Sequence, residues 1–281
     1  MPLVHLTETG EFVNAWGGPD HVPSVDGIFQ WPVGLEGLNC DDEGNLWICG
    51  YKQDDDAVLK FSQSGDLLLR IGQRGHPGDN ADTQFLGGST TCFHDIKTRE
   101  VFISDGYRNR RVISFDSDTG AFKRMWGAYG KDPTTLNLDD GFGDCVHKVT
   151  RGPNGLFYVA DRSKSRIQEF EVSDNSVRYL REVIIAPGTN VFNTGSTWDI
   201  GFSPDRKYLY VGDGSNFRIW SVDLETLEVL GSTSIYSEFE NEINQPLHFG
   251  IVHRFAVKPN GDLLLACVNR GLLQLRFEGV R

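Results

Sequence analysis

The chain has 281 residues, of which 39% are hydrophobic and 23% charged, and its formal net charge is -12. This composition excludes intrinsic disorder and predicts a globular protein with a sizeable core. The negative charge repels phosphate backbones and anionic lipid, so we expect no binding to nucleic acid or to a membrane surface. The longest apolar run, residues 263–268, is too short to span a bilayer.

Glycine and aromatic residues are abundant, with 32 Gly, 18 Phe, 8 Tyr and 6 Trp spread along the chain. Many short strands joined by tight turns require this combination, so the composition favours an all-β fold. The first six residues resemble no secretory signal, and we therefore expect a cytoplasmic location. The five cysteines are widely spaced, and we interpret most of them as free thiols.

In chain order, residues 3–16 are predicted to form two strands that match the second half of a later unit. After them one segment recurs five times, at residues 43–48, 99–103, 154–159, 206–211 and 260–265, with a period of roughly 51 to 55 residues. Each unit contains a short strand, a polar turn, an apolar strand and two further strands, the pattern of a four-stranded antiparallel meander.

One such sheet cannot bury both of its faces, whereas several sheets arranged radially can. We therefore predict an all-β chain with a single domain, residues 1–281, folded as a β-propeller of four-stranded blades. The last unit stops at residues 273–277, before its final strand. We expect an amino-terminal strand to complete that sheet and close the ring.

Three residues with ligand chemistry occupy the same position in different units. Glu36, His147 and His253 each precede the turn glycine of their own unit by eight residues. The innermost strands of a propeller line its axis, so equivalent positions in those strands are expected to converge. Two histidines and a glutamate form a suitable set for Zn²⁺ or another divalent metal, with an open position for water or substrate.

The turns at 161–167 and 213–219, each with an aspartate followed by Arg-Ile, resemble those of NHL-repeat β-propellers. Residues 105–112, Asp-Gly-Tyr-Arg-Asn-Arg-Arg-Val, resemble a motif of the peptidyl-α-hydroxyglycine α-amidating lyases and their bacterial relatives. This resemblance implies a six-bladed propeller in which three histidines bind zinc, calcium lies nearby, and a tyrosine and an arginine act on the substrate hydroxyl. It makes Tyr107 the catalytic residue and implies a lyase that acts on a small molecule such as an N-acyl α-hydroxyglycine.

The sequence departs from that family at several positions. Glu36 stands where the family has its first zinc histidine, and Arg254 follows His253 where the family has an aspartate that helps bind calcium. Ca²⁺ is therefore less expected than Zn²⁺. No residue matches the catalytic arginine, and the repeat count gives five blades where the family has six.

Two other functions fit the same fold. A gluconolactonase-like hydrolase would bind calcium in the channel, with Glu36 and Asp199 as candidate ligands. A non-catalytic propeller would bind a ligand or a protein partner. In a non-catalytic propeller, His147 and His253 would be ordinary packed side chains.

The remaining polar clusters have a structural interpretation. The aspartates of the repeated turns (Asp105, Asp161 and Asp213) are expected to pair with the arginines that follow them (Arg111, Arg166 and Arg218). The run 54–56 of three aspartates is expected to be a solvated turn, with a calcium loop as the alternative. A site of Cys145 and His147 with Cys40 and Cys92 is a further alternative, with His94 as a substitute ligand.

Overall fold

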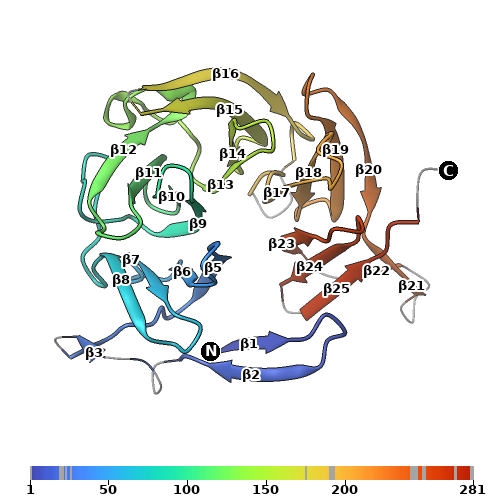
Figure 1. Ribbon diagram of the computed structural model, residues 1–281. Helices are drawn as coiled ribbons and strands as arrows, with labels where there is room; N and C mark the ends of the chain where they lie inside the picture. The colour runs from blue at the N-terminus through green and yellow to red at the C-terminus, as the bar shows by residue number, and fades with distance from the viewer. Residues whose placement is uncertain are drawn as a thin grey trace. The chain divides into compact units, whose positions relative to one another are not determined.

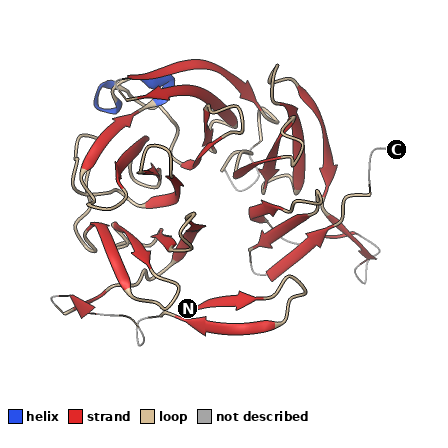
Figure 2. Ribbon diagram, viewed as in Figure 1, coloured by secondary structure: helices blue, strands red, loops and turns tan. Residues whose placement is uncertain are grey.

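The computed structural model describes the whole chain except residues 1, 19–21, 23, 26, 175, 190–193, 241–245, 249–250, 269–270 and 279–281, and no side chains are described for 236–240 and 246–248. The contacts between its Cα atoms divide the chain into two compact units. The first comprises residues 1–127 and 132–136, and the second comprises residues 128–131 and 137–281. Strands dominate both units, and helical structure in the described residues is limited to the single turns η1 (Ala128–Gly130) and η2 (Pro133–Thr135) (Figure 2).

The first unit contains two four-stranded sheets (Figure 1). Their strands are β5 (Leu35–Cys40), β6 (Leu46–Gly50), β7 (Ala57–Phe61) and β8 (Leu67–Gly72), then β9 (Ser89–Asp95), β10 (Glu100–Asp105), β11 (Arg111–Asp116) and β12 (Phe122–Trp126). Two hairpins precede them in the chain: β1 (Leu3–Leu6) with β2 (Phe12–Trp16), and β3 (Ser24–Val25) with β4 (Ile28–Phe29).

The second unit contains two further four-stranded sheets, a three-stranded sheet and a hairpin. The four-stranded sheets consist of β13 (Val146–Arg151), β14 (Phe157–Asp161), β15 (Arg166–Ser173) and β16 (Ser176–Ile184), then β17 (Asp199–Phe202), β18 (Tyr208–Asp213), β19 (Arg218–Asp223) and β20 (Val229–Ser234). The hairpin is β21 (Tyr236–Glu240) with β22 (Pro246–His248), and the last sheet is β23 (Val252–Val257), β24 (Leu263–Cys267) and β25 (Gly271–Leu275).

The predicted repeat is confirmed. Each repeat sheet pairs its strands in chain order and antiparallel, as a meander does, and the described residues contain five such sheets, one per sequence repeat. The turn glycines Gly44, Gly155 and Gly261 have φ values of 81°, 85° and 92°, in the left-handed region that glycine adopts without a steric cost. Completion of the last sheet by an amino-terminal strand stays a prediction.

The apolar core lies between neighbouring sheets of the same unit. In the first unit, Trp47, Ile103 and Phe115 belong to one buried cluster, contributed by β6, β10 and β11. In the second unit, one cluster joins the sheets β13–β16 and β17–β20, and another joins β19 to β23 and β24. The innermost strands pack on one another, β5 on β9 in the first unit and β17 on both β13 and β23 in the second.

Two of the three predicted aspartate–arginine pairs are present and buried. Arg111 Nε lies 3.0 Å from Asp105 Oδ2, with both side chains fully buried, and Arg166 Nε lies 2.9 Å from Asp161 Oδ2. Each pair fixes the turn between the second and third strands of its sheet. These residues therefore have the structural role predicted for them.

The third turn is built differently from the prediction. Asp213 Oδ2 accepts hydrogen bonds from Trp220 Nε1 at 2.9 Å and from Asn216 Nδ2 at 2.7 Å. Arg218 donates to Ser232 Oγ, at 2.9 Å. Trp220 and Asn216 both donate to Asp213 Oδ2, and they take the place that the Arg218 guanidinium was predicted to have.

The prediction of a solvated aspartate turn at 54–56 holds for Asp54, which is exposed in a turn, and was wrong for the other two, because Asp55 is 3% exposed and Asp56 is 1% exposed. Asp55 accepts hydrogen bonds from the backbone N–H groups of Val33 and Gly34, at 2.7 and 2.9 Å. Asp56 pairs with Arg108. These carboxylates tie loops together, which explains their burial.

No helix in the described part of the chain combines the length and apolar character needed to cross a membrane.

Candidate metal centre

The three candidate ligands share a backbone feature that the sequence did not reveal. Glu36 is the extra residue of a β-bulge on β5, because Leu35 and Gly37 face consecutive residues of β6. His147 occupies the same place in a bulge on β13, and His253 in a bulge on β23. In each case the bulged residue is the second of the innermost strand.

A bulge inserts one residue that does not take part in the regular pairing, and it changes the direction of that side chain. Bulges are common beside active sites for this reason. The bulge on β9 carries Thr90 instead, with Ser89 and Thr91 facing consecutive residues of β10. The repeat thus provides a fixed position for a redirected side chain, and three of its occurrences hold a residue that can bind a metal.

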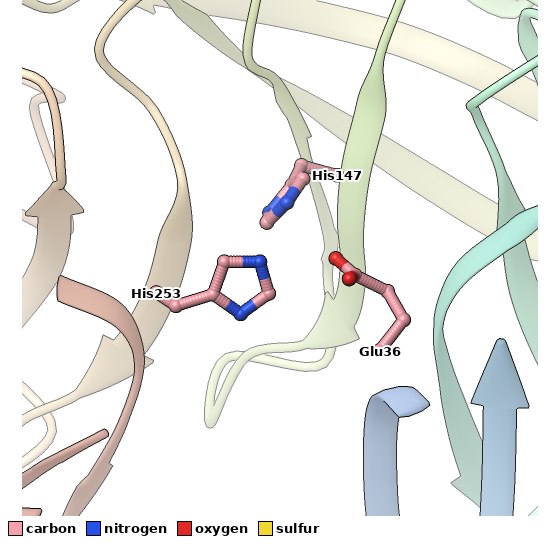
Figure 3. A group of neighbouring side chains, drawn as sticks. All are labelled: Glu36, His147 and His253. Atoms are coloured by element: carbon pink, nitrogen blue, oxygen red, sulfur yellow. The ribbon is translucent and has the colours of Figure 1, made fainter. Parts of the chain in front are cut away.

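In the second unit this position brings two imidazoles together (Figure 3). The ring centroids of His147 and His253 lie 5.1 Å apart with an interplanar angle of 81°, and each ring offers a nitrogen within 4.8 Å of one on the other. His147 is fully buried. Figure 3 also labels Glu36, which belongs to the first unit.

Trp198 holds the histidine pair from one side. Its ring lies 5.6 Å from that of His147 and 5.8 Å from that of His253, edge to face in both cases. Its backbone carbonyl contacts His147 Nδ1. Arg254 Nη1, which can only donate, lies 2.7 Å from the same nitrogen. The Trp198 carbonyl and the Arg254 guanidinium both meet Nδ1, so Nε2 is the candidate ligand atom of this ring.

Asp199 connects the strands that carry the two histidines. This buried side chain accepts a hydrogen bond from the backbone N–H of Phe255 on β23, at 2.7 Å, and its other oxygen lies 2.6 Å from Lys148 Nζ on β13. Lys148 directly follows His147 along the chain, and Phe255 lies two residues after His253. One carboxylate thus fixes both strands next to their bulges.

In the first unit, Glu36 lies beside the predicted catalytic tyrosine. The Tyr107 hydroxyl donates a hydrogen bond to Glu36 Oε1 at 2.8 Å. Tyr107 lies between β10 and β11, and its backbone N–H donates to the carbonyl of Gly88 at 3.1 Å. The ring of Tyr51 packs against that of Tyr107, with centroids 5.9 Å apart. Glu36 was predicted as a metal ligand and Tyr107 as the catalytic residue. The two side chains form one hydrogen-bonded pair.

The loop that carries Tyr107 is fixed by the buried aspartate before it. Asp105 accepts hydrogen bonds from Gly87 N–H at 2.8 Å and from Asn109 Nδ2 at 2.8 Å, in addition to its pair with Arg111. The resemblance to the lyase motif therefore has a physical basis, since its aspartate, its asparagine and its last arginine, Arg111, form the support of the tyrosine.

The residues of the second unit fit a zinc ion. Two nitrogens bound at about 2.0–2.1 Å to one tetrahedral zinc lie roughly 3.3 Å apart, so the pair needs only a small movement of the rings. A backbone carbonyl beside the other ring nitrogen, as Trp198 provides for His147, commonly orients a zinc-binding histidine.

Two arginines contact the histidine pair or the tryptophan beside it. Arg254 Nη1 lies 2.7 Å from His147 Nδ1 and 3.1 Å from the Trp198 carbonyl oxygen. The guanidinium of Arg162 lies 4.5 Å above the ring of Trp198. These arginines and Trp198 were not among the predicted site residues. Trp198 could have been found, since it lies eight residues before Arg206, whose φ of 64° marks the equivalent turn.

The alternative cysteine–histidine site has less support. The bulge at His147 breaks the alternation that would place Cys145 and His147 on one face of the strand. His94, the substitute ligand, stacks on Trp47 with ring centroids 6.3 Å apart, and its Nε2 contacts Ser117 Oγ at 3.2 Å. These contacts are those of a packed structural histidine.

The antiparallel repeat sheets define the chain as a β-propeller. Among solved structures it resembles the WD40 beta propeller domain of Doa1, with a TM-score of 0.56 at 10% identity over 84% of this chain and 62% of that chain. It also resembles a putative 6-phosphogluconolactonase from Bacteroides fragilis, with a TM-score of 0.53 at 17% identity over 95% of this chain and 69% of that one. At these identities the likeness concerns the fold alone.

The sequence comparisons confirm the resemblance to NHL-repeat propellers and to the amidating lyases. The chain is 27% identical to NHL repeat-containing protein 3 of Homo sapiens over 243 residues, 85% of this chain and 62% of that protein. It is 31% identical to peptidyl-glycine alpha-amidating monooxygenase of Mus musculus over 158 residues, 56% of this chain and 15% of that protein.

A third relative is peptidyl-alpha-hydroxyglycine alpha-amidating lyase 2 of Drosophila melanogaster, 28% identical over 162 residues, which are 57% of this chain and 34% of that protein. The chain therefore spans less than two thirds of the length of each of these relatives. No protein-family model matches it.

Proposed function

We propose that the chain is a zinc-dependent lyase that acts on a small hydroxylated substrate such as an N-acyl α-hydroxyglycine. Glu36, His147 and His253 are the proposed ligands, and Tyr107 is the proposed catalytic residue. The observation that carries the proposal is the shared bulge, which redirects these three side chains from the same position of three repeats. The names of the amidating monooxygenase and lyase relatives support the reaction type.

A bound zinc ion would supply a Lewis acid that polarises the substrate oxygen. Tyr107 would pass its own proton to Glu36 along their hydrogen bond and take the proton of the carbinolamide hydroxyl, as the carbon–nitrogen bond breaks and the carbon–oxygen double bond forms. The phenol would then give that proton to the departing amide nitrogen and recover its own from Glu36, so that an aldehyde and an amide leave and the protein is unchanged.

The gluconolactonase alternative has less support because its second calcium ligand is already engaged. Both oxygens of Asp199 are used, one by Lys148 and one by the backbone N–H of Phe255. A cation at Asp199 would have to displace an ammonium group at 2.6 Å. The non-catalytic alternative is decided by the experiment below.

Elemental analysis of the purified protein tests the proposal. We expect about one zinc per chain in the wild type, and loss of zinc in His147→Ala and in His253→Ala. A matched control is His94→Ala, which removes a histidine that lies on Trp47 and should leave the zinc content unchanged. The release of benzamide from N-benzoyl-α-hydroxyglycine then measures the lyase reaction directly.

The outcomes separate the three functions. Zinc with benzamide release supports the lyase, and calcium without zinc supports the lactonase-like hydrolase. A protein with neither metal nor activity is a binding propeller, and the proposal then fails.

A further inference from the structure

The second unit contains a cleft of about 500 Å³ that is lined by residues of the sheets β13–β16 and β17–β20. This volume lies within the range of small-molecule sites, roughly 300–1,000 Å³. The cleft and the candidate metal centre lie at opposite ends of β13, because His147 is the second residue of that strand and Asn154 lies in the turn after its last residue. The lining combines positive, negative and polar side chains: Asn154, Arg181, Arg206, Lys207, Tyr208, Asp223, Leu224 and Glu225.

The wall that comes from the sheet β13–β16 is held in place by two buried side chains. Tyr158 is fully buried and Glu169 is 1% exposed. The Tyr158 hydroxyl accepts a hydrogen bond from Asn154 Nδ2 at 2.8 Å and donates one to Glu169. Arg181 donates to both oxygens of that carboxylate, from Nε at 2.6 Å and from Nη2 at 3.3 Å. The cleft-lining amide and guanidinium are therefore fixed from behind.

The opposite wall carries two cations. The side chains of Arg206 and Lys207 form no ion pair with any residue that the structure describes. The carboxylate that precedes them, Asp205, accepts a hydrogen bond from Ser203 Oγ at 2.6 Å and does not line the cleft. Arg206 has a φ of 64°, a left-handed conformation that glycine adopts more easily. Strain of this kind is found preferentially at functional sites.

The equivalent charges of another sheet are paired with each other. In the sheets β9–β12 and β17–β20, the carbonyl of a turn residue, Arg99 or Lys207, accepts a hydrogen bond from the residue before an acidic one, Asp118 or Glu225. Arg99 Nε donates to Asp118 Oδ2 at 2.9 Å. Lys207 and Glu225 instead line the cleft, and within the described part of the chain no ion pair joins them. The cleft thus takes the place of an ion pair.

The lining presents both signs of charge to a ligand. Arg181 and Glu169 neutralise each other, which leaves two cations on one turn and the carboxylates of Asp223 and Glu225 on another. A simple anion would meet the two carboxylates, and a simple cation would meet the two basic side chains. A molecule with both an ammonium and a carboxylate group finds an opposite charge at each end.

We propose that this cleft binds a small zwitterion of the amino-acid or dipeptide class. Arg206 and Lys207 bind the carboxylate of the ligand, and Glu225 binds its ammonium group. Arg181 uses three of its five N–H groups in the hydrogen bonds to Glu169 and to the Glu225 carbonyl, so two remain for a ligand oxygen. This inference goes beyond the proposed function and requires neither zinc nor lyase activity.

NMR titration of the ¹⁵N-labelled full chain with Gly-Gly tests the inference. We expect saturable chemical-shift changes with a Kd of about 1 mM or lower. N-acetyl-Gly-Gly lacks the ammonium group and Gly-Gly amide lacks the carboxylate, so each should bind at least ten-fold more weakly than Gly-Gly. Glycine is titrated in parallel to separate an amino acid from a dipeptide, and saturable binding of either one supports the inference.

Two variants locate the binding. Arg206→Gly removes a carboxylate partner at a backbone conformation that suits glycine, so it should weaken Gly-Gly binding at least five-fold without lowering the Tm. Glu225→Gln should weaken Gly-Gly binding at least five-fold and leave that of N-acetyl-Gly-Gly unchanged. The matched control is Arg99→Gly, at a φ of 53°, and it should keep the Kd within two-fold. His147→Ala should also keep the Kd, since it acts on the metal centre.

Absence of saturable binding of both glycine and Gly-Gly would overturn the inference. Equal affinities for Gly-Gly and N-acetyl-Gly-Gly would overturn it as well, because the cleft would then be an anion site. An unchanged Kd in both Arg206→Gly and Glu225→Gln would place the ligand elsewhere on the chain. A protein that binds Gly-Gly at this cleft but contains no zinc and releases no benzamide would lose the lyase proposal and keep this one.

Discussion

The hydroxyl of Tyr107 donates a hydrogen bond to Glu36 Oε1 at 2.8 Å, although the two residues are 71 positions apart, Glu36 on β5 and Tyr107 in the loop between β10 and β11. A hydroxyl–carboxylate bond is charge-assisted when the carboxylate is ionised, and it is stronger than a bond between neutral groups. The carboxylate at position 36 therefore orients the phenol of Tyr107.

Tyr107→Phe removes the hydroxyl while the ring keeps its packing against Tyr51. We expect benzamide release from N-benzoyl-α-hydroxyglycine to fall by about 100-fold in kcat, within the usual contribution of a general acid–base residue. KM should change little, because the phenol acts on the proton in the transition state. Steady-state kinetics at saturating substrate measure this effect.

Tyr51→Phe is the matched control, since it removes a hydroxyl from the neighbouring ring, and it should keep more than half of the activity. Equal losses in both variants would show that the loop is disturbed and that Tyr107 has no chemical role.

Arg111→Gln should lower the free energy of unfolding by about 3–5 kcal/mol, because it leaves the buried carboxylate of Asp105 without its charge partner. The guanidinium also donates to the carbonyl of Phe85, at 3.0 Å. Arg218→Gln, at the equivalent position of another sheet, should cost less than about 1 kcal/mol, because Arg218 binds the hydroxyl of Ser232. Urea unfolding monitored by circular dichroism measures both, and equal losses would contradict the different structures of the two turns.

Gly37→Ala should destabilise the first unit by about 1–3 kcal/mol. A Cβ atom at Gly37 would lie 2.5 Å from the backbone oxygen of Thr90, closer than non-bonded atoms approach, so β5 and β9 would have to separate. Gly231→Ala is the control, because nothing lies within 4 Å of a Cβ atom at that position on β20. Thermal unfolding should show a lower Tm for Gly37→Ala and an unchanged or slightly higher Tm for Gly231→Ala.

Acid should destabilise the protein partly through Asp116. Hydrogen bonds from the backbone N–H and the hydroxyl of Thr119 lower the pKa of Asp116 to about 2. A carboxyl whose pKa is lower in the folded state stabilises the fold above its unfolded pKa of about 3.9 and loses that contribution as the pH falls toward 2.

Asp116→Asn removes this titration. The free energy of unfolding should then fall by about 1 kcal/mol less between pH 5 and pH 2 than in the wild type, after allowance for solvent screening at this surface turn. Urea unfolding at several pH values measures the difference, and parallel curves for the two proteins would contradict the prediction.

The fold was largely predictable because it repeats. The turn glycines Gly44, Gly155 and Gly261, which belong to the first, third and fifth repeats, have the positive φ values that the pattern requires, and the strands between them pair in chain order. The same spacing placed Glu36, His147 and His253 at one position of the repeat. A sequence read as a repeat therefore indicates both the strands and the positions that are equivalent among them.

The parts that could not be predicted depend on contacts between residues far apart in the chain. The burial of Asp55 follows from N–H groups about twenty positions earlier, and the contact of Arg254 with His147 joins residues 107 positions apart. The bulges could not be predicted either. One extra residue cannot be recognised from the alternation of apolar and polar residues in so short a strand. Local patterns determine the strands, whereas long-range packing determines the charges around the site.

The bulge on β9 has a consequence for how such a site can be acquired or lost. It holds Thr90 in the place where other sheets hold Glu36, His147 or His253, and the backbone there is the same whichever residue occupies it. A single codon change at this position can therefore add or remove a candidate ligand without rebuilding a strand. Related propellers with one fold therefore need not share one chemistry.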